Sequence, residues 1–259
     1  MLSADELANV YRRYLDPQTN WWPVRFMLQL HEAVRIVYSH VLAEGGDGVD
    51  LGANIGLHTA GMLRAPAGRV FAIEANPLMI ERILRRPDVS GHRVAVLNLA
   101  IVPFAQETVS FRISQKYIEL GSVDPNYFSK HFPQSVHDAE LEDITVRAQT
   151  LDGFLTLYGI RKGFIKIDLE GIDSEVLKSA IIPFANRMAI SYETEIDKQV
   201  ELWRHFRNFE YSVFDCFMNE LTEETFALPR VAPIDRFAFP REYEVDAIRV
   251  KLDEFWQRY

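Results

Sequence analysis

Hydrophobic residues along this chain follow two spacings, one typical of helices and one typical of buried strands. Residues 23–42 carry apolar side chains at helical spacing, among them Phe26, Leu30 and Val34, which predicts an amphipathic helix. Beyond this segment, short apolar runs typical of buried parallel strands alternate with helical stretches. The runs that predict strands occupy residues 47–51, 69–74, 93–101, 109–113, 144–148, 164–171 with its loop, 188–192 and 211–217. This alternation predicts an α/β fold with a mostly parallel twisted sheet and helices on both faces.

Capping residues and prolines place the helices between these strands. Pro77 suits the first position of a helix, where its missing N–H costs little. Thr150 or Asp152 can cap the next predicted helix. Residues 173–186 also have helical periodicity, with Pro183 marking a kink or an early end. The remaining predictions are a helix over residues 198–209 and a strand, a helix or both over residues 247–259.

Length and composition favour one α/β domain with some decoration. A chain of 259 residues can bury one sizeable core, and we expect a helical cap over residues 1–44 followed by a ligand-binding domain over residues 45–259. The formal net charge of -9 argues against nonspecific binding to nucleic acid, which needs clustered Lys and Arg. We therefore expect a small or neutral substrate as the partner, and homo-oligomerisation stays open.

Cysteine content and hydropathy indicate the cellular compartment in which we expect the chain. Cys216 is the single cysteine, which excludes an intramolecular disulfide and a cysteine zinc site, so a reducing, cytoplasmic setting is expected. Its place in a predicted late strand favours a small buried side chain over a nucleophile. The N-terminal residues lack the basic and apolar regions of a signal peptide, and no apolar stretch is long enough to span a membrane. We therefore expect no membrane partner.

The segment 48–56, which joins the first predicted core strand to the next helix, carries the most informative chemistry. Gly52 and Gly56 let the backbone approach a ligand closely where a side chain would clash. Glu74 ends the following predicted strand, where an acid can accept both hydroxyls of a ribose. These features indicate a cofactor that contains a nucleoside.

Asn54 helps to decide which nucleoside this is. A dinucleotide fingerprint has glycine at this middle position, where it makes room for a pyrophosphate. The pattern Asp50-x-Gly52-x-Asn54-x-Gly56 is instead similar to the first motif of class I methyltransferases, which use S-adenosylmethionine. An acid before the loop also fits the ammonium group of that ligand better than it fits a pyrophosphate.

A second chemical motif occupies the predicted strand and loop at residues 164–171. Strand alternation places Lys166 and Asp168 on one face, where a buried lysine needs an acidic partner to keep its charge. The candidates for that partner are Asp168, Asp50 and Glu193. Asp168 and Glu170 fall at the carboxyl end of the strand, which in a parallel sheet opens into the ligand crevice. Either acid could accept the proton of a substrate hydroxyl or bind a hard cation, while a structural ion pair explains Lys166 at least as well.

Several segments of the chain, taken in order, resemble the FkbM family of S-adenosylmethionine-dependent methyltransferases. They are residues 48–56, 71–77, 150–152 and 164–177, and the strand end at Glu193. Residues 165–171 are the most specific part, because many methyltransferase families share the first motif. Asp173 stands where the family commonly has Glu, and Ser179 where Gly is usual; neither touches the cofactor motif. The resemblance implies a class I, Rossmann-like fold and methyl transfer to oxygen, commonly a hydroxyl of a sugar or a polyketide-type natural product.

On this hypothesis the motifs divide between cofactor binding and catalysis. The residues expected to hold the amino-acid part of S-adenosylmethionine are Asp50, Gly52, Asn54 and Gly56. Glu74 is expected at the ribose, and Asn76 and the 98–101 segment with Ala100 at the adenine. Asp168 is the first choice for the base or a metal contact, ahead of Glu170, Lys166 and Glu193.

Other groups could share the chemistry. A histidine could be the base, because its ordinary pKa suits proton removal near neutrality, and the ones to test are His58, His131 and His137. Asp168, Glu170 and Glu193 could form an Mg²⁺ site, for which their spacing is weak support. Residues 117–140 have the length and composition of a substrate loop or lid. Trp21 and Trp22 could line a pocket, although packing of the N-terminal helix explains them better.

Two other functions stay open from the sequence. One is a nicotinamide-dependent oxidoreductase, which Asn54 in the glycine loop disfavours. The other is a noncatalytic cofactor-binding protein that kept the fold and lost turnover. Binding of S-adenosylmethionine or NAD tests the first alternative, and a methyl-transfer assay tests the second.

Overall fold

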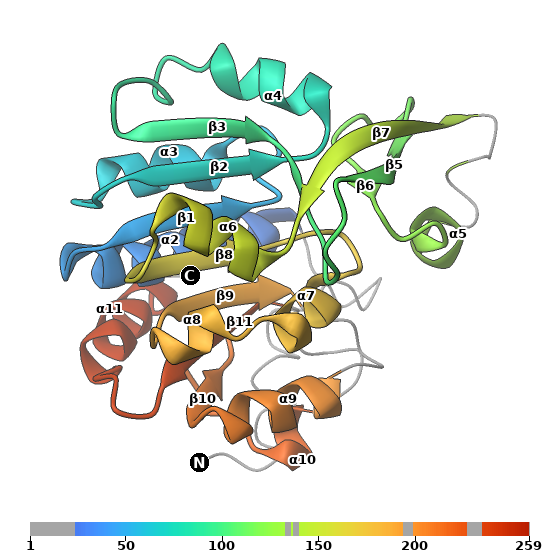
Figure 1. Ribbon diagram of the computed structural model, residues 1–259. Coiled ribbons are helices and arrows are strands. Elements are labelled where there is room, and N and C mark those ends of the chain that lie inside the picture. The colour runs from blue at the N-terminus through green and yellow to red at the C-terminus, as the bar shows by residue number, and fades with distance from the viewer. Residues whose placement is uncertain (1–23, 133–135, 137–139, 194–198, 227–234, 259) are drawn as a thin grey trace.

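The computed structural model describes residues 24–132, 136, 140–193, 199–226 and 235–258, and its central feature is a seven-stranded sheet (Figure 1). The strands in sheet order are β10 (Tyr211–Phe214), β11 (Asp235–Pro240), β9 (Ala189–Glu193), β8 (Gly163–Ile167), β1 (Asp47–Leu51), β2 (Val70–Glu74) and β3 (Val94–Asn98). The pairings from β9 to β3 are parallel, whereas β11 runs antiparallel to both of its neighbours. This order places β8 and β1 at the centre of the sheet.

A smaller four-stranded sheet lies beside the carboxyl ends of β2 and β3 (Figure 1). Its strands in order are β4 (Ala100–Ile101), β7 (Leu141–Gln149), β5 (Thr108–Ser114) and β6 (Gly121–Ser122). Phe111, Ile113 and Val146 from this sheet share a hydrophobic cluster with Ala75, which follows β2. The small sheet is therefore packed onto the edge of the main sheet at which β2 ends.

Helices cover both faces of the main sheet. One core contains residues of α6 (Leu151–Tyr158), α7 (Asp173–Ser179), α8 (Ile182–Ala185) and α9 (Gln199–Asn208). The core on the other face contains residues of α2 (Val24–Ala43), α3 (Leu57–Arg64) and α11 (Asp246–Trp256). The shorter helices are α4 (Pro77–Leu84) beside β2 and β3, α5 (Tyr127–His131) in the segment before β7, and α10 (Glu223–Phe226) beside α9. The predicted α/β fold with a mostly parallel sheet and helices on both faces is confirmed.

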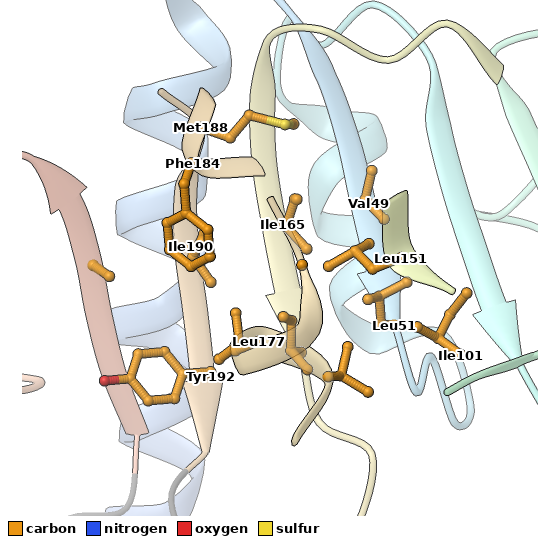
Figure 2. Packing of buried hydrophobic residues seen from close by; sticks show 14 of the residues in the cluster. Val49, Leu51, Ile101, Leu151, Ile165, Leu177, Phe184, Met188, Ile190 and Tyr192 are labelled. Carbon is orange, nitrogen blue, oxygen red and sulfur yellow. The ribbon is translucent and has the colours of Figure 1, made fainter. Parts of the chain in front are cut away.

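Strand alternation decides which residues enter which core. Ile165 of β8 lies in the main core with Val49 of β1 (Figure 2). Ile167 belongs to the same core, whereas Phe164 packs in the core that contains α2. Each fully buried aliphatic side chain of this kind stabilises the fold by about 1.5–3 kcal/mol. The same alternation turns Lys166 toward the α2 side of the sheet, on the face opposite Ile165 and Ile167 as predicted.

The predicted strand over residues 93–101 is divided at Leu99. Its first part is β3, whereas its last two residues form β4 and pair with β7 in the small sheet. The Leu99 N–H donates to the Glu74 carbonyl oxygen at 3.1 Å, and Asn98 Nδ2 donates to the same oxygen at 3.1 Å. These bonds tie the end of β3 to the end of β2, and the chain then leaves the main sheet and carries Ala100 toward β7.

The predicted helix over residues 173–186 is also divided, into α7 and α8. The Asp152 carboxylate accepts hydrogen bonds from the N–H groups of Ile181 and Ile182, each at 2.9 Å, and so starts α8 as a separate helix. Thr150 caps α6 by accepting from a backbone N–H at 3.1 Å. Of the two predicted caps, Thr150 therefore serves α6, whereas Asp152 serves α8.

The C-terminal region differs most from the sequence-based prediction. β10 ends at Phe214 rather than at residue 217, because the Asp215 carboxylate accepts from the Asn219 N–H at 2.8 Å and closes a turn. The prediction lacks β11, and residues 247–259, which it left between strand and helix, contain most of α11. Cys216 is fully buried, as expected.

Helix α2 is the described part of the predicted cap over residues 1–44. It packs against α3, α11 and β8, so it belongs to the layer that covers one face of the sheet; the division at residue 44 stays a prediction. Trp21, Trp22 and His137 lie outside the described residues. Within the described part of the chain, no helix has the length and apolar character needed to cross a membrane.

Candidate functional site

A pocket opens where the carboxyl ends of β1, β2 and β8 meet the small sheet. Phe111 and Val123 contribute apolar lining from the segment between β4 and β7. The free space, with its open mouth included, is about 540 Å³. The predicted site residues that line it are Gly52, Asn54, Glu74, Asn76, Ala100, Asp168 and Glu170.

Glu74, the last residue of β2, lines this pocket while 7% exposed. Its Oε2 accepts a hydrogen bond from the Asn54 N–H at 2.8 Å, and its Oε1 accepts one from the Asn76 N–H at 2.7 Å. Burial raises the pKa of Glu74, and these two backbone hydrogen bonds oppose the rise. Because each carboxylate oxygen has a further lone pair, Glu74 can still accept hydroxyl groups of a ligand.

The loop after β1 passes very close to the end of β8. A Cβ atom on Gly52, whose φ is +71°, would lie 1.8 Å from the Asp168 carbonyl oxygen, so only glycine fits there. Asn54 is also left-handed, with φ at 50°, and its buried Oδ1 has no hydrogen-bond partner among the described residues. Gly56 begins α3 as its N-cap and lies outside the pocket lining. The loop therefore brings its backbone to the pocket and holds one buried acceptor that has no partner among the described residues.

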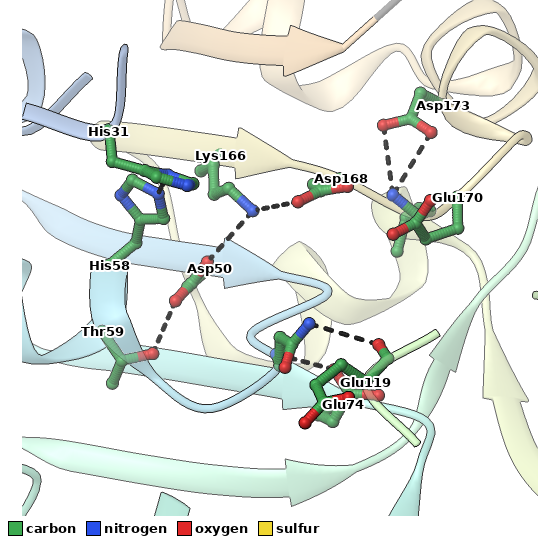
Figure 3. A network of polar contacts seen from close by, with 12 residues as sticks. His31, Asp50, His58, Thr59, Glu74, Glu119, Lys166, Asp168, Glu170 and Asp173 are labelled. Atoms are coloured by element: carbon green, nitrogen blue, oxygen red, sulfur yellow. Dashed lines mark hydrogen bonds and ion pairs between the residues drawn. The ribbon is translucent and has the colours of Figure 1, made fainter. Parts of the chain in front are cut away.

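Lys166 is the centre of a charged network next to the pocket (Figure 3). Its Nζ lies 2.8 Å from Asp168 Oδ2 and 4.0 Å from Asp50 Oδ1, which confirms two of the three acidic partners predicted for it. Burial lowers the pKa of Lys166, but the Asp168 and Asp50 carboxylates outweigh burial and hold it above its ordinary value. Lys166 therefore keeps its charge although it is 8% exposed.

Asp50 lies at the far end of the same network. It is fully buried, and its Oδ2 accepts from Thr59 Oγ1 at 2.6 Å (Figure 3). Burial raises the pKa of Asp50, and the nearby Lys166 ammonium opposes the rise. Neither Asp50 nor Lys166 belongs to the pocket lining, so their direct contact with a cofactor or substrate stays a prediction.

Two more carboxyl groups follow β8. Glu170 lines the pocket, and burial together with the negative charge of Asp168 raises its pKa to about 8. Asp173 begins α7 and accepts from the Leu169 N–H with both oxygens, each at 3.2 Å. Burial and Asp168 raise the pKa of Asp173 to about 7. Both groups can therefore exchange a proton near neutral pH, and of the two only Glu170 lines the pocket.

Two asparagines next to Glu74 hold the segment between β5 and α5 against the pocket. Asn54 Nδ2 donates to the Glu119 carbonyl oxygen at 3.2 Å, and Asn76 Nδ2 donates to that of Ile118 at 2.8 Å. Asn76 Oδ1 also caps α4 by accepting from a backbone N–H. The Asn76 side chain therefore fixes local structure, and its contact with an adenine stays a prediction.

Ser122 and Tyr127 attach this part of the chain to Glu170. Ser122 Oγ donates to the Glu170 carbonyl oxygen at 2.7 Å, and the Tyr127 hydroxyl donates to Glu170 Oε2. Sequence reasoning missed both residues, because no spacing rule connects Glu170 with positions 48 and 43 residues away. The one available signal was the polar and aromatic composition of residues 117–140, where a lid was predicted; the action of this segment on a substrate stays a prediction.

The remaining candidates lie outside the pocket lining. His58 of α3 is buried and pairs with His31 of α2, Nε2 to Nδ1, at 3.1 Å, and burial, followed by the charge of Lys166, lowers the pKa of His58 well below its ordinary value. The His131 ring lies 4.8 Å from that of Tyr127, and Glu193 ends β9. Among the described residues, no group of three or more His, Cys, Asp or Glu side chains is arranged to hold a metal ion, so the Mg²⁺ site gains no support.

The sequence and the fold were compared with those of known proteins. The sequence matches the methyltransferase FkbM domain over residues 50–225, and no curated protein matches it significantly. The FkbM methyltransferase structure from Methylobacillus flagellatus KT has 15% identity and a TM-score of 0.40, covering 75% of this chain. This chain spans 44% of the length of that structure.

A second solved structure belongs to the precorrin-6y C5,15-methyltransferase of Geobacter metallireducens GS-15. It has 14% identity and a TM-score of 0.37, covering 79% of this chain and 85% of that one. At TM-scores this low, neither likeness to a solved structure carries an argument about the site.

The domain match itself covers well over half of the chain and contains every pocket residue named above. It includes the glycine loop, Glu74 and the strand end from Lys166 to Glu170, on which the resemblance in the sequence depended. Together with the order of the main sheet, it identifies the fold as that of the class I methyltransferases. This chain belongs to the FkbM family of methyltransferases.

Proposed function

We propose that the chain transfers a methyl group from S-adenosylmethionine to a hydroxyl oxygen of a small molecule, such as a sugar or a natural-product alcohol. The observation that carries this proposal is that Glu74, Asp168 and Glu170 line one and the same pocket. Membership of the FkbM methyltransferase family supports it.

The residues of the pocket fit S-adenosylmethionine. Glu74 offers two acceptor oxygens to the ribose hydroxyls, and Ala100 and Phe111 offer apolar surface to the adenine. The loop at Gly52 presents backbone rather than a side chain, and the buried Asn54 Oδ1 lacks a partner among the described residues. When bound, this cofactor supplies a methyl group that its sulfonium has already activated.

The acid side of the pocket favours a hydroxyl as the acceptor. A hydroxyl must lose its proton when it is methylated, and Asp168 and Glu170 are two carboxyl groups in the lining that can receive one. Lys166 fixes the Asp168 carboxylate from behind at 2.8 Å. An anionic acceptor would meet repulsion from the Asp168 carboxylate, which favours a neutral sugar or alcohol.

Calorimetry with S-adenosylmethionine and with NAD tests the cofactor. We expect S-adenosylmethionine to bind and NAD to give no response. Tight binding of NAD without any response to S-adenosylmethionine would favour the oxidoreductase alternative and overturn the proposal.

A methyl-transfer assay over a panel of sugars and natural-product alcohols tests the reaction. We expect Asp168→Asn to bind the cofactor as the wild type does and to lower turnover. Asp246→Asn, which changes an exposed carboxylate on α11, is the matched control and should keep full turnover. Cofactor binding without transfer to any acceptor would favour the noncatalytic alternative, and full turnover in a folded Asp168→Asn variant would remove Asp168 from catalysis.

A further inference from the structure

Glu170 is held by an element that lies far from it in the sequence. Ser122 Oγ donates to its carbonyl oxygen at 2.7 Å and accepts from the Asp124 N–H at 2.9 Å. The Tyr127 hydroxyl donates to its Oε2. Both the backbone and the carboxylate of this glutamate are therefore fixed by the segment that precedes β7.

Hydrophobic packing within the segment that precedes β7 positions Tyr127. It is 6% exposed and packs in a cluster with Phe128 and Val136. Its ring makes an edge contact with the Phe128 ring at 5.4 Å, and its N–H donates to the Asp124 carbonyl oxygen at 3.1 Å. The hydroxyl therefore reaches Glu170 only when the segment is folded and docked against the end of β8.

Glu170 itself has a backbone conformation that must be held by neighbouring groups. Its φ is 54°, a left-handed conformation that non-glycine residues keep only where their surroundings hold it. The bond from Ser122 to its carbonyl oxygen supplies one such restraint. This conformation allows the side chain to line the pocket beside Asp168.

The charged and titratable groups around Glu170 come from each element packed against it. They are Lys166 and Asp168 at the end of β8, Asp173 of α7 and Tyr127 of α5, and Glu193 at the end of β9 acts on Tyr127. Burial and Asp168 raise the pKa of Glu170 to about 8, whereas the hydrogen bond from Tyr127 opposes the rise. Asp168 is less suited than Glu170 to receive a proton, because its carboxylate already accepts a hydrogen bond from the Lys166 ammonium.

We propose that Glu170 takes the proton of the acceptor hydroxyl and that Tyr127 is its positioning residue, so that proton removal depends on docking of the segment that carries Tyr127. This inference rests on the proposed function. As the acceptor oxygen bonds to the methyl carbon, the carbon–sulfur bond breaks and its electron pair returns to sulfur. The hydroxyl proton passes to Oε1 of Glu170, while Oε2 stays hydrogen-bonded to Tyr127.

The first test measures the titration of Glu170 without any substrate. In protein with ¹³C-labelled glutamate carboxyl groups, the Glu170 resonance is the one that Glu170→Gln removes. Tyr127→Phe keeps the ring and its cluster but removes the hydroxyl, so the titration midpoint should rise by about half a pH unit or more. Tyr243→Phe is the matched control, because it removes a hydroxyl that donates to Glu44 at 2.9 Å, and it should leave the Glu170 midpoint unchanged.

The second test measures turnover against pH with an acceptor from the panel. Tyr127→Phe should leave the affinity for S-adenosylmethionine unchanged, lower turnover at pH 7 about threefold or more, and move the rise of turnover to higher pH, whereas Tyr243→Phe should do none of these. Glu170→Gln should lower turnover about 100-fold or more.

The outcomes of these two tests distinguish the positioning role of Tyr127, the role of Glu170 as the base and the proposed function. An unchanged Glu170 midpoint in Tyr127→Phe would overturn the positioning role, and full turnover in Glu170→Gln would overturn its assignment as the base. A wild type that methylates no acceptor would overturn the proposed function and the catalytic step with it, while the titration would still decide whether Tyr127 controls Glu170.

Discussion

Lys166 and Asp168 form an ion pair at 2.8 Å at the end of β8, and this pair joins the interior of the sheet to the lining of the pocket. Behind it, Asp50 lies 4.0 Å from the same ammonium group. One buried cation therefore balances two carboxylates, one of which is fully buried and one of which faces the ligand space.

Replacing Lys166 with Met should lower the free energy of unfolding by about 3 kcal/mol, because it leaves a buried charge uncompensated. Asp50 should account for most of the loss, since the Asp168 side chain is 27% exposed. Denaturant unfolding measures the change. Lys178→Met, which breaks an exposed pair with Glu201 at 3.1 Å, is the control and should cost less than about 1 kcal/mol. Equal losses in the two variants would contradict this account.

Gly52→Ala should be more damaging than Gly159→Ala, although both glycines have positive φ. At Gly159 (φ +64°) a Cβ meets no atom within 4 Å, so the cost should be the backbone term of about 1–2 kcal/mol. At Gly52 a Cβ would collide with the Asp168 carbonyl oxygen, which should add about 1–3 kcal/mol. Thermal and denaturant unfolding of both variants separates the two terms, and similar stabilities would mean that the loop can move away from Asp168.

Glu74→Gln should weaken binding of S-adenosylmethionine about 100-fold. The amide nitrogen cannot accept a hydrogen bond, so either the Asn54 or the Asn76 N–H loses its partner and the ribose loses a charged acceptor. Calorimetry gives the affinity directly. Glu81→Gln changes an exposed carboxylate of α4 and should bind as the wild type does. Wild-type affinity in Glu74→Gln would exclude Glu74 from the cofactor site.

Asp173 should make the protein less stable as the pH rises. Its pKa is raised to about 7 in the folded chain from an ordinary value of 3.8. The folded state therefore binds more protons than the unfolded state between these two values, and stability falls through this window. Asp173→Asn lacks this titration, so the free energy of unfolding of the wild type relative to the variant should fall between pH 5 and pH 8. A difference that is the same at both pH values would contradict the raised pKa.

Features that depend on local patterns could be predicted from the sequence. The bounds of β1 and the position of Glu74 at the end of β2 follow from apolar runs that glycines and a terminal acid delimit. Strand alternation likewise predicted that Lys166 would be buried beside an acid. These are the parts of the site that the glycine loop and the β8 motif supply.

Features that depend on distant partners could not be predicted in this way. Asp152 starts α8 from 29 residues away, and Asn98 ends β3 by binding the carbonyl oxygen of Glu74 on another strand. Tyr127 of α5 reaches Glu170 from 43 residues away, where its ring packs with Phe128 and Val136. In each case the deciding contact is tertiary, so neither periodicity nor propensity reports it.

The position of β11 between β9 and β10 has a consequence for synthesis of the chain. The strands whose ends line the pocket, β1, β2 and β8, have all been synthesised by residue 167, and they can pair with one another once they leave the ribosome. β10 pairs within the main sheet through β11, so it must wait for residues 235–240. A nascent chain paused before that point would hold the cofactor side of the pocket on an unfinished sheet, with the edge of β9 open to pairing with another chain.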